Sequence, residues 1–172
     1  MPRMNRKLLT SLFLFLLLTG CASYRLGSML PPDLQTVYMP TATNITNEPL
    51  LENEVTSAVF SELQRDGSLS PASEDNADTQ LTVRITGYDL TPLSFTRDNR
   101  SEPDQYRLTL TAEVELVETE SGKTLVRSGR IRGEDEFPLS GDITQAKRIG
   151  LPGATQDLAR VIVATITEAW VE

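Results

Sequence analysis

A long run of alternating side chains over Gln105 to Thr119 constrains the fold of this chain more than any other feature. One face of an extended chain there would carry Tyr106, Leu108, Leu110, Ala112, Val114 and Leu116. The opposite face would carry Arg107, Thr109, Thr111, Glu113 and Glu115. A period of two residues is the signature of a β-strand with one buried and one solvated face. The run therefore predicts a strand near the centre of an antiparallel sheet that is covered on one side.

Three further strands are expected around it. The turn Glu120–Lys123 includes a glycine that tolerates positive φ, and it predicts a hairpin that returns over Thr124 to Arg132. Upstream, residues 81–86 alternate in the same way, and residues 36–39 have the composition of a short first strand. Short turns make the last three strands antiparallel neighbours.

Two helices complete the pattern. An apolar residue recurs every fourth position over residues 49–65, where Asn47 is expected to cap the start and Gly67 to end the helix. A second stripe runs from Leu158 to Trp170, after an interval over residues 133–153 that is expected to be a loop. The order β-α-β-β-β-α predicts an α+β fold: a two-layer sandwich in which two helices cover one face of a mixed four-stranded sheet.

The N-terminal segment has the three parts of a secretory signal. Arg3, Arg6 and Lys7 precede the apolar block Leu12 to Leu18, and the only cysteine, Cys21, follows after Thr19 and Gly20. The block is shorter than the ~20 residues that span a bilayer. Leu18-Thr19-Gly20-Cys21 resembles the lipobox of bacterial lipoproteins, in which the cysteine becomes the acylated N-terminus. This predicts a signal peptide over residues 1–20, a lipidated tether over 21–34 and a single α+β domain over 35–172.

Charge and residue usage exclude several functions. Without residues 1–20, the remaining 152 residues include 13 basic and 24 acidic ones, a formal net charge of −11, which disfavours non-specific nucleic-acid binding. The chain has no histidine, so nucleophiles activated by histidine are excluded, and the commonest transition-metal ligands are missing. The run Glu134-Asp135-Glu136 leaves an acid–base or metal site as an alternative, although a solvated acidic loop is expected. We therefore expect no catalytic residues, no metal site and no cofactor apart from the lipid on Cys21.

Short segments in a particular order resemble the LptE family of outer-membrane lipoproteins. After the lipobox come Tyr24-Arg25-Leu26-Gly27, Met39-Pro40, Glu48-Pro49-Leu50-Leu51-Glu52, Leu63-Gln64-Arg65-Asp66-Gly67, Ala77-Asp78-Thr79-Gln80-Leu81, Gly87-Tyr88, Tyr106-Arg107-Leu108 and Gly122-Lys123. Each segment is short, and the resemblance rests on their order and spacing across the mature chain.

The resemblance implies a non-enzymatic role in lipopolysaccharide export. Members of the family plug the large β-barrel LptD in a one-to-one complex, help it to assemble and contact lipopolysaccharide on its way to the outer leaflet. Ala22 after the cysteine fits sorting to the outer membrane, on its periplasmic side. The alternative is another periplasm-facing lipoprotein adaptor, such as a secretin pilot or an assembly factor, because it would share the anchor and the α+β domain.

Lipopolysaccharide contact would need cations beside apolar groups, since lipid A carries phosphates next to acyl chains. Two places offer this combination. One is the connection Leu90 to Asp104, where Leu93 and Phe95 precede Arg97 and Arg100. The other is the hairpin, where Val126 and Ile131 accompany Lys123, Arg127, Arg130 and Arg132. The alternative is that these cations pair with Glu113, Glu115 and other cross-strand carboxylates.

Overall fold

The structure is a computed structural model that describes residues 31, 33–95, 103–138 and 142–169. Several sequence predictions fall outside these residues: the signal peptide, the acylated Cys21 and most of the tether, Arg97 and Arg100, and Trp170. Leu34, at the end of the expected tether, is buried and belongs to the core.

Six strands form one mixed sheet, so the predicted number of four was too low. They are β1 (Thr36–Tyr38), β2 (Thr43–Asn44), β3 (Ser70–Pro71), β4 (Thr79–Phe95), β5 (Pro103–Glu118) and β6 (Thr124–Pro138). Their order is β3-β1-β4-β5-β6, with β2 paired to β4 beside β1. The two extra strands, β2 and β3, have two residues each, which is too short to leave a periodic signal in the sequence. The first strand, β1, pairs in parallel with β4. The expected antiparallel pairing of β4, β5 and β6 is confirmed.

The three long strands extend beyond their predicted ends. β4 continues to Phe95 and pairs with β5 along its length, with register shifts between Ile85 and Gly87 and between Pro92 and Ser94. These irregularities lie at Gly87 and Pro92, where β-bulges let the two strands stay paired. The expected connection over residues 90–104 is therefore strand at both ends, and only residues 96–102 separate β4 from β5.

Helix α2 (Leu51–Asp66) lies where the sequence predicted it, but its start differs. The residue before it, Leu50, adopts φ 64° and no side chain caps the first turn, so the expected cap by Asn47 is wrong. Asn44 instead donates to the carbonyl of Glu48 at 2.8 Å and holds the chain that enters the helix. The end is as predicted: Gly67 has φ 75°, and its N–H donates to the Leu63 carbonyl at 3.0 Å. A short 3₁₀ helix, η2 (Glu74–Asn76), follows.

Helix α3 (Ile143–Glu168) begins much earlier than expected. Asp142 caps it by accepting from the Gln145 N–H at 2.8 Å, and Pro152 lies within it. The expected loop over residues 133–153 was wrong, because its first part is the end of β6 and its last part is the first half of α3.

Three glycines within the expected loop are contact residues between α3 and the sheet. A Cβ at Gly133 would lie 2.2 Å from the Leu158 backbone nitrogen, and one at Gly150 would lie 2.0 Å from the ring of Phe137. A Cβ at Gly153 would lie 2.4 Å from the Asp135 carboxylate. Helix α3 can therefore approach β6 only because these side chains are missing.

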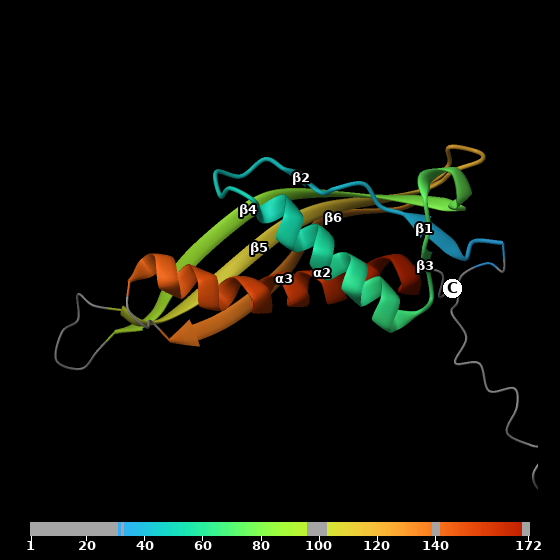
Figure 1. Cartoon of the computed structure of the whole chain (residues 1–172). Coiled ribbons are helices and arrows are strands. Elements are labelled where there is room, and N and C mark those ends of the chain that lie inside the picture. The colour runs from blue at the N-terminus through green and yellow to red at the C-terminus, as the bar shows by residue number, and fades with distance from the viewer. Residues whose placement is uncertain (1–30, 32, 96–102, 139–141, 170–172) are drawn as a thin grey trace, which may run out of the picture.

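Both helices cover the same face of the sheet, as predicted (Figure 1). Apolar side chains of β4 and β5 such as Leu81, Ile85 and Leu110 pack there with Val59 of α2 and Ile162 of α3, all fully buried. The start of α3 is also fastened by Lys147, whose Nζ lies 2.8 Å from Glu48 and 5.2 Å from the centroid of the Tyr88 ring. Burial and the nearby Glu48 carboxylate raise the pKa of Tyr88 to about 12. Among the described residues no helix covers the opposite face of the sheet, which is hereafter called the open face.

Candidate functional site

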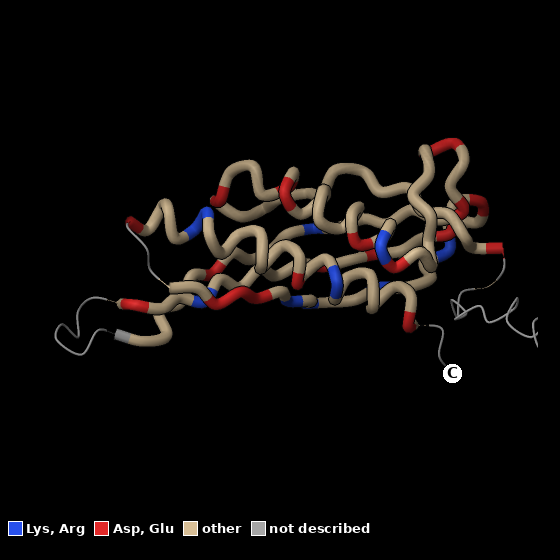
Figure 2. Tube along the Cα trace, turned by 60° about the horizontal axis from the view of Figure 1, so that its bottom comes forward, with Lys and Arg blue, Asp and Glu red and all other residues tan. Residues whose placement is uncertain are grey.

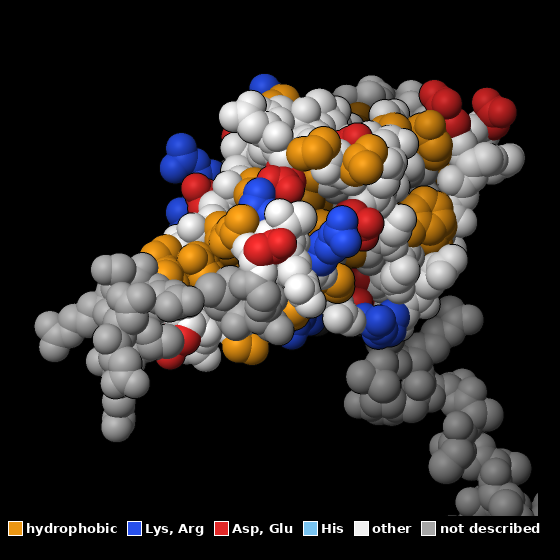
Figure 3. Space-filling model, turned by 60° about the vertical axis from the view of Figure 1, so that its left-hand side comes forward, with side chains coloured by type: hydrophobic (Ala, Val, Ile, Leu, Met, Phe, Trp, Pro, Cys, Tyr) orange, Lys and Arg blue, Asp and Glu red, His pale blue; other side chains and the backbone are white. Residues whose placement is uncertain are grey.

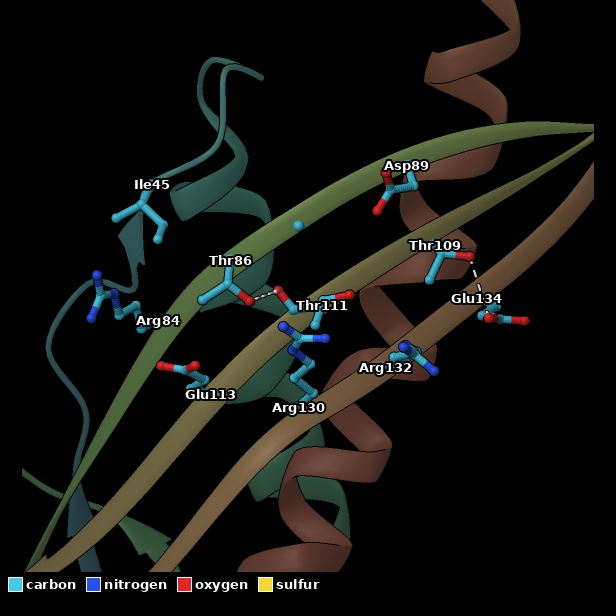
Figure 4. Close-up of a pocket in the computed structure, with 11 residues that line it drawn as sticks. Ile45, Arg84, Thr86, Asp89, Thr109, Thr111, Glu113, Arg130, Arg132 and Glu134 are labelled. Atoms are coloured by element: carbon cyan, nitrogen blue, oxygen red, sulfur yellow. Dashed lines mark hydrogen bonds between the residues drawn. The ribbon is translucent and has the colours of Figure 1, made fainter.

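The open face is lined by polar side chains that strand alternation brings together. In Figure 4 threonine, arginine and carboxylate side chains of β4, β5 and β6 project from this face, and the helices lie behind the sheet. The register places Arg84 opposite Glu113 and Thr111 opposite Arg132, which are cross-strand neighbours on the same face. Charges of both signs are spread along the trace (Figure 2).

The central part of this face is hollowed. The hollow has a volume of about 610 Å³ and is bordered on one side by Ile45, next to β2. Its lining residues are Ile45, Arg84, Thr86, Gly87, Asp89, Thr109, Thr111, Glu113, Arg130, Arg132 and Glu134. We call it the arginine hollow because three guanidinium groups, those of Arg84, Arg130 and Arg132, surround it.

Two other arginines of the sheet are engaged by carboxylates. Arg127 forms an ion pair with Glu115 across β5 and β6, and this hydrogen bond, with one from Thr124, lowers the pKa of Glu115. Arg107 lies 3.5 Å from Glu134 and also pairs with Glu136, which raises the pKa of Arg107. For Arg127, the alternative of cross-strand pairing is therefore the one the structure shows.

The arginines of the hollow are in a different situation. Within the described part of the chain, Arg84, Arg130 and Arg132 form neither an ion pair nor a hydrogen bond through their side chains. All three are exposed. Arg130 and Arg132 lie two residues apart on one strand, although a bulge between Ala112 and Val114 of the neighbouring strand shifts the register beside them. Three like charges thus meet without a partner from the described residues.

The apolar groups expected beside the hairpin cations lie on the other face. Val126 and Ile131 are 9% and 5% exposed and belong to the core under the helices. The alternation of the strand separates them from Arg127, Arg130 and Arg132, which are exposed. The combination of cation and apolar surface expected at the hairpin is therefore divided between two faces of the sheet.

Lys123 lies in the turn between β5 and β6, where its N–H donates to the Ser121 hydroxyl at 3.1 Å. This turn and residues 96–102 lie at opposite ends of β5, as predicted. The sequence predictions thus fall into three places: Lys123 at one end, Arg97 and Arg100 in the undescribed segment at the other end, and the hollow between them.

The run Glu134-Asp135-Glu136 is strand rather than loop, and its carboxylates are separated. Glu134 and Glu136 meet Arg107 on the open face, whereas Asp135 faces α3 near Gly153. Burial raises the pKa of Asp135, and the charges of Asp157 and Glu136 add to this effect. No group of three or more His, Cys, Asp or Glu among the described residues is placed to hold a metal ion.

Sequence reasoning missed Arg84, Thr109 and Thr111 as members of one site. Each stands at a polar position of an alternating run, so their face was predictable. Their convergence was not, because it depends on the register between three strands and on the shifts at Gly87 and Glu113.

Comparisons with known proteins identify the family and the fold. The family model described as LptE, lipopolysaccharide-assembly, matches residues 34–166. No curated protein sequence matches this chain significantly.

Solved structures match with low sequence identity. A protein from Xanthomonas campestris matches with a TM-score of 0.56 and 9% identity over 79% of this chain and 85% of its own. The PelC dodecamer from Paraburkholderia phytofirmans matches with a TM-score of 0.54 and 15% identity, over 83% of this chain and 96% of its own. A putative lipoprotein from Caulobacter crescentus matches with a TM-score of 0.51 and 11% identity, over 74% of this chain and 88% of its own. At these identities the similarity establishes a shared fold.

None of the helices in the described part of the chain has the length and apolar character required to cross a membrane.

Proposed function

This chain belongs to the LptE lipopolysaccharide-assembly family, and from that membership we propose that it plugs the export barrel LptD and helps it to assemble. The observation that carries the proposal is the family match, which spans residues 34–166 and therefore all the helices and strands except the last two residues of α3. The role requires neither catalysis nor a cofactor other than the lipid proposed on Cys21.

The open face of the sheet supports this role. A plug needs a polar surface, because the interior of a large outer-membrane barrel is polar. The exposed side chains of β4, β5 and β6 that face away from the helices are threonine, arginine and glutamate over most of their length, while the apolar side chains are buried against α2 and α3.

Co-purification tests the plug proposal. Full-length protein extracted from its own outer membranes in mild detergent is expected to elute with a very large β-barrel in a one-to-one ratio. Elution of the chain alone, from cells that contain an intact barrel, would refute the proposal. Elution with a secretin or another complex would support the alternative adaptor role instead.

We also propose that lipopolysaccharide is contacted at the end of the molecule where β4 leads into residues 96–102. Leu93 of β4 and Ile143 of α3 are 37% and 44% exposed, and Arg97 and Arg100 follow Leu93 closely in the chain. Figure 3 shows this end, where exposed apolar side chains alternate with charged ones. Apolar groups next to cations are what lipid A requires. The hairpin cations Lys123, Arg127, Arg130 and Arg132 are the weaker candidate, because Val126 and Ile131 are buried.

Charge reversal tests this assignment. Arg97→Glu with Arg100→Glu is expected to reduce capture of lipopolysaccharide by the immobilised protein while the barrel still co-purifies. Lys123→Glu with Arg127→Glu is the matched control, since it changes the net charge equally at the other end of β5. If the first pair of substitutions left binding unchanged and the control pair abolished it, contact would have to be assigned to the hairpin.

Anchoring at Cys21 is the third part of the proposal. Labelling of growing cells with a fatty-acid probe is expected to mark the wild-type chain and not the Cys21→Ser variant. Fractionation is expected to place the labelled chain in the outer membrane, facing the periplasm. Equal labelling of both chains would exclude lipidation at this residue.

A further inference from the structure

The arginine hollow is the densest group of unpaired cations in the described residues. We propose that it docks carboxylate side chains on the inner wall of the partner barrel and thereby fixes the orientation of the plug. The inference rests on the proposed function and names the surface through which the partner would be held. Its residues are Arg84 on β4 and Arg130 and Arg132 on β6, with hydroxyls from Thr109 and Thr111 between them.

Lys123 and Arg148 also lack an ion pair among the described residues, but only these three unpaired cations line one hollow. Five basic side chains in the described residues form ion pairs within the molecule: those of Arg65, Arg107, Arg127, Lys147 and Arg160. The three guanidinium groups of the hollow have no such partner among the described residues. They line one hollow with a volume of about 610 Å³. Arg130 and Arg132 share β6, and Arg84 lies on β4 with β5 between, so an external carboxylate would give these guanidinium groups the partner that no described side chain supplies.

Three carboxylates, those of Asp89, Glu113 and Glu134, also line the hollow, and among the described residues none of them forms an ion pair with its three arginines. Glu134 lies on the side of the hollow away from Arg84 (Figure 4), and its carboxylate is 3.5 Å from Arg107. Glu113 lies between Arg84 and Arg130 but forms no ion pair with either in the described structure. A guanidinium group presents several N–H donors in one plane and matches a carboxylate in a bidentate geometry.

The lining favours protein carboxylates over lipid A. Ile45, at 51% exposed, is the one large apolar side chain among the lining residues, and it stands at the border. Acyl chains next to a phosphate would find no apolar floor there, because the floor consists of threonine side chains and Gly87. The wall of a barrel interior is a polar sheet surface, which matches the extended polar face of β4, β5 and β6.

Net charge explains why such a dock would set orientation. The chain without residues 1–20 carries a formal charge of −11, so an acidic wall is repelled by most of its surface. At the hollow, Arg84, Arg130 and Arg132 balance the lining carboxylates, one of which, Glu134, is paired with Arg107, so the repulsion is weakest there. Complementary and repulsive contacts together select one way of docking, which is how charge contributes specificity at interfaces.

A competition in cells tests the inference. A tagged barrel is purified from cells that express equal amounts of wild-type chain and Arg130→Glu/Arg132→Glu chain, and mass spectrometry gives the ratio of the two in the complex. We expect the variant to be depleted by about tenfold or more, because reversal leaves carboxylates facing carboxylates. Arg65→Glu/Arg148→Glu is the matched control: it makes the same change in charge on the helical layer, and it is expected to enter the complex equally with wild type.

Each outcome decides one point. Absence of wild type from the purified barrel would refute the proposed function itself. Wild type present together with an undepleted Arg130→Glu/Arg132→Glu chain would refute only the docking surface, as would equal depletion of the control. If that variant lost lipopolysaccharide capture while it competed normally for the barrel, the hollow would be a lipid A site and the inference would be overturned. Thermal unfolding of each variant, which should match wild type because these side chains are exposed, verifies that folding is intact.

Discussion

The covered and open faces of β4, β5 and β6 are made from alternate residues of the same strands, yet they differ in almost every property. On the covered face, Leu81, Leu110 and their neighbours are fully buried against two helices. On the open face, threonine, arginine and glutamate meet in ion pairs and around a polar hollow. The strand pleat thus separates the residues that hold the fold together from those available to a partner. Mutations on one face should change stability, and mutations on the other should change recognition.

The largest expected effect is the loss of a covered-face side chain. Leu110 is fully buried, so Leu110→Ala should lower the free energy of unfolding by about 2–5 kcal/mol through lost transfer energy and a cavity. Its neighbour Thr111 lies on the open face, and Thr111→Ala should change it by less than about 0.5 kcal/mol. Urea unfolding of the chain without residues 1–21 measures both. Similar losses for the two variants would contradict the division between the faces.

Two glycines of β6 provide the next comparison. Gly133→Ala would bring a Cβ to 2.2 Å from the Leu158 backbone, and overpacking of this kind costs about 1–3 kcal/mol or more. Gly129→Ala, in the same strand, meets no atom within 4 Å and should leave stability unchanged or slightly higher. Thermal unfolding of the pair checks this. A tolerated alanine at Gly133 would mean that α3 does not pack closely on β6.

Asp135 is a charged residue on the covered face, where the other side chains are mostly apolar. Its titration tests the difference between the two faces. Burial raises its pKa in the folded state, so the ionised carboxylate destabilises the fold near neutral pH. The stabilising effect of protonation is complete below the unfolded pKa, about 3.9, and is lost as the pH rises through the higher folded pKa. Asp135→Asn should therefore increase stability at pH 7 and show no gain at pH 3. Unfolding curves at the two pH values give the difference, and a destabilised Asn variant at pH 7 would show that the carboxylate has a structural role.

The smallest effect is expected on the open face, at the ion pair between Glu115 and Arg127. The pKa of Glu115 is lowered, mainly by its hydrogen bond from Arg127, so the pair contributes stability above pH ~4.3 that is lost in acid. Because Arg127 is largely exposed, solvent screens the interaction. Glu115→Gln should thus shift the midpoint of urea unfolding at pH 7 less than Leu110→Ala, Gly133→Ala or Asp135→Asn. A shift as large as that of Gly133→Ala would mean that the open face also carries stability.

The predictability of the fold follows the length of the periodic segments. Helix α2 and strand β5 were correctly placed because each has a stripe or an alternation over many residues. The first half of α3 was missed because Pro152, Gly150 and Gly153 are breakers on local grounds. In the folded chain the two glycines are required by close contact with Asp135 and Phe137, so a tertiary constraint reverses the local preference.

The candidate site shows the same limit. The polar identity of the open face was predictable from residues 81–86 and 105–119, and the family resemblance from ordered segments is confirmed over residues 34–166. The division of the hairpin patch was not anticipated: Val126 and Ile131 are near Arg127, Arg130 and Arg132 in sequence but on the other side of the sheet. Proximity in sequence was taken as proximity in space, which strand alternation forbids.

The sequence by itself determined which face each residue of the long strands presents, because alternation is a property of the extended backbone and needs no distant partner. It also determined the amphipathic helix α2 and the family. Only the tertiary structure decided which arginines are paired, since Arg127 reaches Glu115 while Arg84, Arg130 and Arg132 converge unpaired on one hollow. The distances between these arginines and the nearby carboxylates depend on the strand register, the bulges and the approach of α3 to β6. Register, bulges and helix approach are in turn set by packing between segments far apart in the chain.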